Sequence, residues 1–493
     1  MDKENDGEVS GARPKPKDLI LDITGSFGRY QIWLCFIVFL SKFAIAFHQL
    51  AIIFYAPPLR YACGDSTEEL NLCPCDSPKY NYSIFTSTIM TEWNLICERK
   101  SLASIVQVTF QGGTLVGSLA FGALSDRYGR RKPFIVACVI QFVFGLTGAF
   151  LTSYVLFTIF RFIVGLSVGG TMVIGFVIIM EFIGPEYRET ISALYQVPFN
   201  LGSVLLPLIS YQYRDFRDFQ LAISIPTAVF VIYFYALPET PRWLIAKNQT
   251  EKAIKVLTLT AKINKRPTDN IRTNVEAYAA AAARNKLPTG TTLDLFRTPN
   301  LRKNILAMSF NWVMCSYCYY GVAQFVGLLS GNIFINVAAT SCLVTIGTFL
   351  SIPFMKFFGR KTILLICHFI CCSCLIVLAF SEGIASVICA SIGVVSAFVV
   401  FVVVYLYCGE LFPTVVRNAA VGFSSMCARI GSMIAPLVVD LKDIQPWLAP
   451  LAFAVVPFLA FFITMLLPET KGCELTTTIE EGEAFGKKTK TTP

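Results

Sequence analysis

The sequence predicts an all-α membrane protein with twelve transmembrane helices in two pseudo-symmetric six-helix bundles. Apolar runs of about 20 residues, the length that crosses a bilayer as a helix, recur along the 493 residues. The composition agrees, since 55% of the residues are hydrophobic and only 15% are charged, against about 25% charged in soluble domains. Short motifs also recur about 230 residues apart, which indicates two matching halves.

Twelve apolar runs define the predicted spans, and a polar stretch separates them into two sets of six. The first set is 30–55, 103–123, 134–152, 154–179, 190–210 and 219–237. The second set is 304–326, 334–356, 362–380, 385–408, 415–438 and 446–467. An even number of spans places both termini on one side of the membrane. Clusters of Lys and Arg in the short loops identify that side as cytosolic.

These spans divide the chain into five segments. In order, they are a cytosolic N-terminus at 1–29, a six-helix bundle at 30–237 with an extracellular Cys-containing loop at 56–102, a cytosolic linker with short helices at 238–303, a second bundle at 304–467 and a cytosolic tail at 468–493. The net charge of +9 comes from loops at the membrane surface. We therefore expect the lipid bilayer, and no nucleic acid, as the macromolecular surroundings.

The polar loop after the first span carries the features of an extracellular segment. It contains Cys63, Cys73, Cys75 and Cys97, whereas most of the other cysteines lie inside apolar runs. An even set of cysteines in such a loop predicts two disulfides, although four cysteines allow three pairings. The loop also contains a glycosylation sequon at Asn81.

Three pairs of motifs relate the two halves by a nearly constant offset. The pairs begin at Gly129 and Gly359 (359 − 129 = 230), at Glu181 and Glu410 (410 − 181 = 229), and at Pro238 and Pro468 (468 − 238 = 230). Each pair follows the equivalent span in its half. Such a repeat predicts two parallel six-helix units related by an axis along the membrane normal.

Longer motifs point to one family. The segment Gly122-Ala-Leu-Ser-Asp-Arg-Tyr-Gly-Arg-Arg resembles the loop between spans two and three in the major facilitator superfamily. Pro238-Glu-Thr-Pro-Arg-Trp-Leu and Gly409-Glu-Leu-Phe-Pro-Thr-Val-Val-Arg narrow the resemblance to the organic cation and anion transporter family, over roughly residues 20–480. The resemblance implies the major facilitator fold. It also implies transport of organic ions across the plasma membrane by alternating access.

Charged residues mark the cytosolic ends of the spans. They are Asp126, Arg130, Glu181, Arg188, Glu239 and Arg242 in the first half, and Arg360, Glu410, Arg417 and Glu469 in the second. One interpretation is that they are interfacial side chains reaching toward water. The alternative is a network of ion pairs that latches the two halves together on the cytosolic side, where partly buried networks cost several kcal/mol to break. The family resemblance assigns these motifs that gating role.

Charges near the middle of a bilayer are costly, so they are candidates for function. Lys42 lies near the middle of the first span, Arg429 near the middle of the eleventh, and Arg161 in the outer part of the fourth. No predicted span has an Asp or Glu in its interior. The central cations therefore need an anion, which a substrate carboxylate or chloride supplies. By resemblance, a basic residue at the position of Arg429 is typical of organic-anion and carnitine carriers.

Aromatic side chains are expected to line the centre, because amphipathic organic ions need apolar contact with a few polar anchors. Three of the candidates in span seven share one helix face by their spacing, and they match the pocket helix of the resembled family. An aromatic stripe without such a match indicates packing more often than a pocket. The candidates are Trp312, Tyr319 and Tyr320 in span seven, Phe401 and Tyr405 in span ten, and Tyr195, Gln196 and Phe199 in span five.

The resulting prediction is a polyspecific organic-ion transporter of the plasma membrane that carries amphipathic organic anions. The organic-anion resemblance implies exchange for a carboxylate, with chloride or a dicarboxylate as counter-ion. The first alternative is a carnitine-like zwitterion or organic-cation carrier, and the second is a membrane sensor or receptor that does not transport. We find no metal-ligand spacing, no phosphate-binding loop and no catalytic constellation, so we expect neither a cofactor nor an enzyme. The histidines, His48 and His368, are interpreted as structural.

Overall fold

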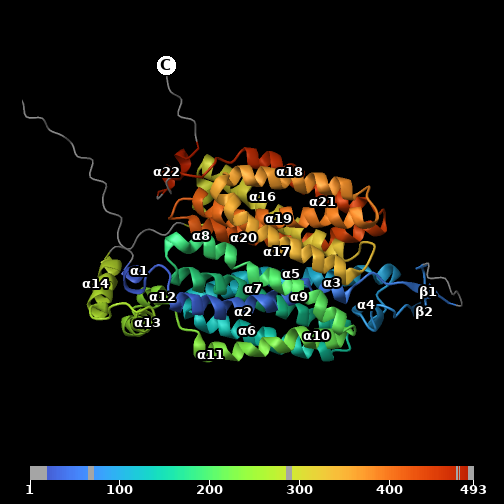
Figure 1. The fold of residues 1–493 in the computed structure, drawn as a ribbon, viewed down its shortest axis with the longest axis horizontal. Helices are drawn as coiled ribbons and strands as arrows, with labels where there is room; N and C mark the ends of the chain where they lie inside the picture. Colours follow the sequence, from blue (N-terminus) through green and yellow to red (C-terminus); the bar gives the residue numbers. More distant parts are fainter. Residues whose placement is uncertain (1–18, 65–70, 285–290, 474–475, 477, 487–493) are drawn as a thin grey trace, which may run out of the picture.

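The computed structural model describes residues 19–64, 71–284, 291–473, 476 and 478–486. Two layers of long helices run side by side along the long axis (Figure 1), one layer from each half of the chain. The disulfide-containing loop lies at one end of the bundle, here called the loop end, and the helices between the two halves lie at the other, the linker end. The predicted segments 1–29 and 468–493 fall partly outside the described residues.

The first half contains six spans, some of which are broken into shorter helices. They are α2 (Arg29–Leu50) with α3 (Ile52–Tyr55), α5 (Ser101–Tyr128), α6 (Arg131–Thr147), α7 (Tyr154–Phe182), α8 (Pro185–Leu194) with α9 (Val197–Gln212), and α10 (Phe216–Ser224) with α11 (Tyr233–Ala236). A 3-10 segment, Ile225–Ile232, joins α10 to α11. A proline at the start of this segment and another at the start of α9 coincide with these breaks.

The second half repeats the arrangement with less interruption. Its spans are α16 (Pro299–Val326), α17 (Ile333–Phe357), α18 (Arg360–Leu378), α19 (Gly383–Leu411), α20 (Arg417–Val439) and α21 (Leu448–Met465). Each of the twelve predicted spans therefore falls on helix. A 3-10 turn, Asp440–Asp443, follows α20 at the loop end.

Eleven segments within the described ranges are long and apolar enough to cross a membrane, and α16 is the predicted span that does not meet that measure. Its polarity comes from side chains that the protein interior covers, including Asn304, Asn311 and Ser316. A helix surrounded by other helices needs no continuous apolar surface toward lipid. The low hydropathy of α16 thus reflects its central position.

Close packing inside the first half depends on glycines in α5 and α7. A Cβ atom on Gly117 would lie 1.9 Å from the carbonyl oxygen of Leu166, and one on Gly169 would lie 2.2 Å from that of Thr114. Backbone at these distances leaves no room for a side chain. Gly122, farther along α5, has open space around its Cβ position.

Gly117→Ala is therefore expected to destabilise the protein by about 2 kcal/mol, because overpacking forces the two backbones apart. Gly122→Ala is the matched control on the same helix, where alanine favours the helix by up to about 1 kcal/mol. Thermal unfolding of the purified variants tests the contrast. Equal melting temperatures for the two variants would contradict the packing argument.

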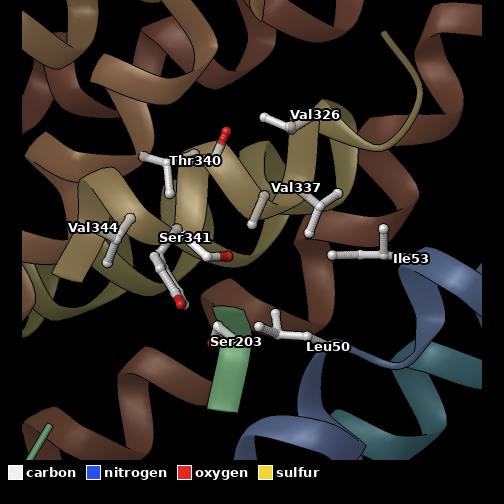
Figure 2. Close-up of a pocket in the computed structure, with 11 residues that line it drawn as sticks. Leu50, Ile53, Ser203, Val326, Val337, Thr340, Ser341 and Val344 are labelled. Atoms are coloured by element: carbon white, nitrogen blue, oxygen red, sulfur yellow. The ribbon is translucent and has the colours of Figure 1, made fainter. Parts of the chain in front are cut away.

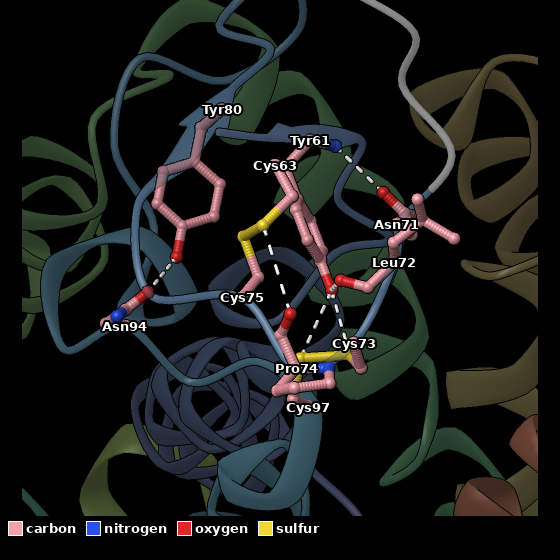
Figure 3. The surroundings of a disulfide bond; sticks show 10 residues. All are labelled: Tyr61, Cys63, Asn71, Leu72, Cys73, Pro74, Cys75, Tyr80, Asn94 and Cys97. Atoms are coloured by element: carbon pink, nitrogen blue, oxygen red, sulfur yellow. Dashed lines mark hydrogen bonds between the residues drawn. A yellow bond between two sulfur atoms is a disulfide. The ribbon is translucent and has the colours of Figure 1, made fainter. Parts of the chain in front are cut away.

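The loop end carries a small disulfide-linked subdomain (Figure 3). Cys63 pairs with Cys75, and Cys73 pairs with Cys97, which selects one of the three pairings that the sequence left open. Strand β1 (Tyr61–Cys63) runs antiparallel to β2 (Pro78–Tyr80). Asn81, in the sequon, follows β2, and its side chain accepts a hydrogen bond from Ser83 N at 2.8 Å. Glycosylation at Asn81 stays a prediction.

The remaining short helices are α4 at the loop end and six others at the linker end. They are α4 (Ile89–Glu92), α1 (Leu19–Thr24), α12 (Pro241–Ala246), α13 (Thr250–Ile263), α14 (Ile271–Arg284), α15 (Asp294–Arg297) and α22 (Ile479–Ala484). Helix α1 packs with α12, α13 and α14 around a small apolar core that contains Ile20, Leu244 and Leu257. Asn264 connects this core to the first span, because its Oδ1 accepts a hydrogen bond from the backbone N–H of Tyr30 at 2.9 Å.

Candidate functional site

Two cations are buried at the seam between the halves. Lys42 on α2 is 1% exposed and Arg429 on α20 is 4% exposed. The ammonium of Lys42 lies 3.7 Å from the ring centroid of Tyr195, and Nη2 of Arg429 lies 3.8 Å from the sulfur of Met172. Neither side chain forms an ion pair with a residue that the structure describes. Both cations therefore lack a counter-ion within the described part of the chain.

Aromatic rings connect these cations across the seam. Trp312 on α16 packs edge-on against Tyr405 on α19, with centroids 4.3 Å apart, and Phe401 lies 6.1 Å from Trp312. Phe176 on α7 bridges the halves, because its ring lies 5.9 Å from Tyr405 and 5.4 Å from Tyr195. The structure thus brings together most of the predicted aromatic candidates and both central cations.

The other candidates lie around this seam. Tyr319 contacts Tyr320 and, at 6.4 Å between centroids, Phe199 of the opposite half. Gln196, which lies between α8 and α9, is 8% exposed. The sequence reasoning missed Met172 and Phe176, which lie one turn apart on α7. Their i, i+4 spacing in a span that also carries a cation was the available signal.

Two polar atoms in this region have no protein partner. Nε1 of Trp312 and Nε of Arg429 are buried without a hydrogen bond to any described residue. A buried donor left unpaired costs about 1–3 kcal/mol. Both groups are donors, so a ligand that accepts hydrogen bonds satisfies them.

The charged motifs form one cluster in each half. Nη2 of Arg130 lies 3.0 Å from Glu181, and Nη1 of Arg130 contacts Asp126. Glu239 accepts hydrogen bonds from the backbone of Arg130 at 2.7 Å and of Arg131 at 3.3 Å. Burial raises the pKa of the Glu239 carboxyl above its usual value, and those backbone donors oppose the shift.

The second half contains an equivalent cluster, whose residues lie 229 or 230 positions after those of the first half. Arg360 pairs with Glu410 at 2.8 Å, and its backbone donates to Glu469 at 2.8 Å. The ion pairs of Arg130 and Arg360 thus join helices of the same half, and a latch of ion pairs between the halves stays a prediction. The reason for the pairing within a half is geometric, because each arginine begins the helix that packs beside its own carboxylate.

The other predicted gate residues donate to backbone carbonyls. Nε of Arg188 donates to Ile183 and Nε of Arg417 donates to Phe412, each at 3.3 Å. Nε of Arg242 donates to the carbonyl of Glu181 at 3.2 Å. These bonds hold the chain where a span ends. Helix α8 also packs against α17 and α19 of the opposite half at this end.

Contacts between the halves at the loop end were not predicted. Lys100 pairs with Asp443 at 2.7 Å, and the hydroxyl of Ser104 donates to Asp440 at 2.7 Å. Phe334, at the start of α17, inserts among three aromatic residues of the first half. Its ring centroid lies 5.9 Å from Phe54, 5.5 Å from Phe85 and 5.4 Å from Tyr211. The two halves are therefore closed against each other at the loop end.

A small cavity lies just inside this closure (Figure 2). Leu50, Ile53 and Ser203 of the first half face Val337, Ser341 and other residues of α16 and α17. Its volume is about 20 Å³, enough for about one water molecule. An organic ion does not fit this cavity until the halves separate here.

Phe334→Ala is expected to open the loop end, because the truncation removes three aromatic contacts of about 0.5–1.5 kcal/mol each. Ser203→Cys, introduced in the cavity, should then react faster with a membrane-impermeant maleimide than it does beside the native Phe334. Lys100→Met is the control, since its exposed ion pair contributes about 1 kcal/mol or less. An unchanged labelling rate in the Phe334 variant would contradict this assignment of the closure.

A two-half bundle of membrane-spanning helices with a buried aromatic and cationic seam defines a major facilitator transporter. The family model described as sugar (and other) transporter matches residues 60–481. The inward-open xylose transporter from E. coli shares the fold, with a TM-score of 0.69 over 92% of this chain and 99% of that chain, at 18% identity. The chain is a multi-pass membrane carrier and not an enzyme.

Two similar proteins show to which family within this superfamily the chain belongs. An organic cation transporter protein of Drosophila melanogaster is 31% identical over 96% of this chain and 95% of that protein. Solute carrier family 22 member 6 of Pseudopleuronectes americanus is 33% identical over 86% of this chain and 77% of that protein. The chain belongs to this organic cation and anion transporter family of the major facilitator superfamily, and it is an organic-ion transporter.

Proposed function

We propose that the protein carries amphipathic organic anions. The observation that supports this is the pair of buried cations, Lys42 and Arg429, at the seam between the halves, where no described residue supplies a carboxylate to either. A charge in a low-dielectric interior is stable only when it is paired. A substrate carboxylate pairs with either cation, while Trp312, Tyr405 and Phe176 supply apolar contact for its organic part.

The transport cycle that we propose depends on which end of the seam is closed and on which side of the membrane each end lies. Aromatic and ionic contacts close the loop end, and substrate access there requires the separation of Phe334 from Phe54 and Phe85. We assign the loop end to the outside of the plasma membrane and both termini to the cytosol. Disulfides belong to oxidising compartments, and the motif loops rich in Lys and Arg belong to the cytosolic face.

A zwitterion or cation carrier is the second candidate. The observation in its favour is the edge-on pair of Trp312 and Tyr405 beside Phe401, because clustered aromatic faces attract ammonium groups. A carnitine-like substrate places its carboxylate on Arg429 and its ammonium on these rings. A simple cation, in contrast, meets two positive charges at this seam.

A parallel uptake assay distinguishes the candidates. Purified protein in vesicles is offered a labelled aryl carboxylate, carnitine or a quaternary ammonium, with either chloride or a dicarboxylate inside. We expect carboxylate uptake to exceed cation uptake at least tenfold, about 1.4 kcal/mol of discrimination. Faster cation uptake would refute the anion proposal. Background uptake of every ion by correctly folded protein would favour a sensor or receptor.

A further inference from the structure

A third buried cation lies inside the first half, away from the seam. Arg161 on α7 is 2% exposed, and it makes no ion pair with any residue in the described ranges. Its Nη2 donates to the carbonyl of His48 at 2.9 Å, while Nε and Nη1 have no described partner. The guanidinium carbon lies 4.3 Å from the ring centroid of Phe110 and 5.3 Å from that of Tyr55. The charge is therefore held between aromatic rings without a carboxylate.

His48, whose backbone carbonyl accepts the hydrogen bond from this arginine, also has a buried imidazole. It is 0% exposed, and neither ring nitrogen has a hydrogen-bond partner among the residues described. A Cβ atom on Gly145 would lie 3.1 Å from Cε1 of His48 and 3.1 Å from the hydroxyl of Ser224. The absence of a side chain at position 145 thus makes room for both the imidazole and this hydroxyl.

Two hydrogen bonds of Gln220 tie α6 and α3 together beside this arginine. Gln220 donates from Nε2 to the carbonyl of Gly145 at 2.6 Å, and its Oε1 accepts from the hydroxyl of Tyr55. The aromatic ring of Tyr55 in turn contacts the guanidinium of Arg161. This cluster of residues therefore contains one permanent cation and one imidazole without a described hydrogen-bond partner, in enclosed and mostly aromatic surroundings.

This cluster is separate from the central seam. Its residues come from α2, α3, α5, α6, α7 and α10, all in the first half. On α7, Arg161 precedes Met172, the contact of Arg429, by 11 residues, which is about 16 Å along a helix. A rocking motion of one half against the other leaves such a cluster intact.

The unpartnered groups are suited to a small anion. A guanidinium has only donors, and a neutral imidazole has one N–H donor. An isolated buried cation is unfavourable by several kcal/mol, which an anion in contact with it offsets. We propose that Arg161 and His48 bind an inorganic monovalent anion, chloride, as a fixed ion of the first half that is not transported. This inference does not depend on the identity of the transported substrate.

Thermal unfolding of the full chain in nanodiscs tests the proposal. Sodium chloride, sodium bromide and sodium gluconate are compared at equal ionic strength. We expect the melting temperature to be higher by about 2 °C in chloride and bromide than in gluconate, because a bound ion stabilises the folded state. Equal melting temperatures in the three salts would overturn the proposal.

Variants locate the ion. Arg161→Met should abolish the difference between chloride and gluconate, and His48→Phe should raise the chloride concentration for half-maximal stabilisation about tenfold. Arg429→Ala should keep the full response. Loss of the response in the Arg429 variant, with retention in His48→Phe, would place the anion in the central seam and refute the assignment.

A direct measurement covers the case in which Arg161→Met does not fold. Crystals of the native protein grown in bromide should give an anomalous peak within hydrogen-bond distance of the Arg161 guanidinium. Density for water alone at that position, without an anomalous peak, would overturn the proposal. The same bromide data would show whether a second ion lies beside Arg429.

Discussion

Arg429→Ala is expected to lower kcat/KM for an aryl carboxylate about a hundredfold. The guanidinium is 4% exposed and forms no ion pair with a carboxylate of the residues that the structure describes, so we assign its negative partner to the substrate. Removal of one member of a buried, hydrogen-bonded charge pair costs about 2–5 kcal/mol, and a hundredfold loss is about 2.7 kcal/mol. Initial uptake rates at several substrate concentrations give the ratio.

The controls separate the charge from the shape of Arg429. Arg429→Lys keeps the charge without the forked geometry, and we expect it to recover part of the lost activity. Lys42→Met removes the second cation and should weaken a dicarboxylate more than a monocarboxylate. Carboxylate uptake that is indifferent to Arg429→Ala, at equal protein levels, would show that this side chain is structural.

The fold was predictable because its signals are periodic and repeated. Every predicted span falls on helix, and the motif pairs at offsets of 229 and 230 occupy equivalent positions in the two halves. The sequence also predicted which face of α16 points toward the centre, because the spacing of Trp312, Tyr319 and Tyr320 places them on one side of the helix. These features depend on apolar runs, repeated motifs and helical spacing, which can be recognised without knowing any contact between distant residues.

Contacts between distant elements were not predictable from the sequence. Phe334 lies in an ordinary apolar run, and only the packing of the two halves shows that its ring inserts among aromatic residues of the first half. The same limit applies to the predicted latch of ion pairs between the halves. Sequence position placed Arg130 and Glu181 at one membrane surface, but whether they pair within a half or between halves depends on tertiary geometry.

Arg130→Met is expected to reduce the transport rate about thirty- to a hundredfold and to change KM less than threefold. Arg130 holds Glu181 through its side chain and Glu239 through its backbone, so it ties the ends of α6 and α7 to the chain after α11. The side chains of Arg130 and Glu181 are 14% and 16% exposed. Loss of one partner in a buried pair costs about 3–5 kcal/mol, and the partial exposure reduces this to about 2–3 kcal/mol.

Asp126→Asn is the matched control for this cluster. The carboxylate of Asp126 contacts the same arginine, yet its side chain is 76% exposed, and exposed ion pairs contribute about 1 kcal/mol or less. We therefore expect less than a fivefold change in rate from Asp126→Asn, and an intermediate change from Glu181→Gln. Vesicle uptake together with thermal unfolding of each variant gives the order. If Asp126→Asn were as damaging as Arg130→Met, the function of the cluster would lie in a conformation where Asp126 is buried, as a latch between the halves requires.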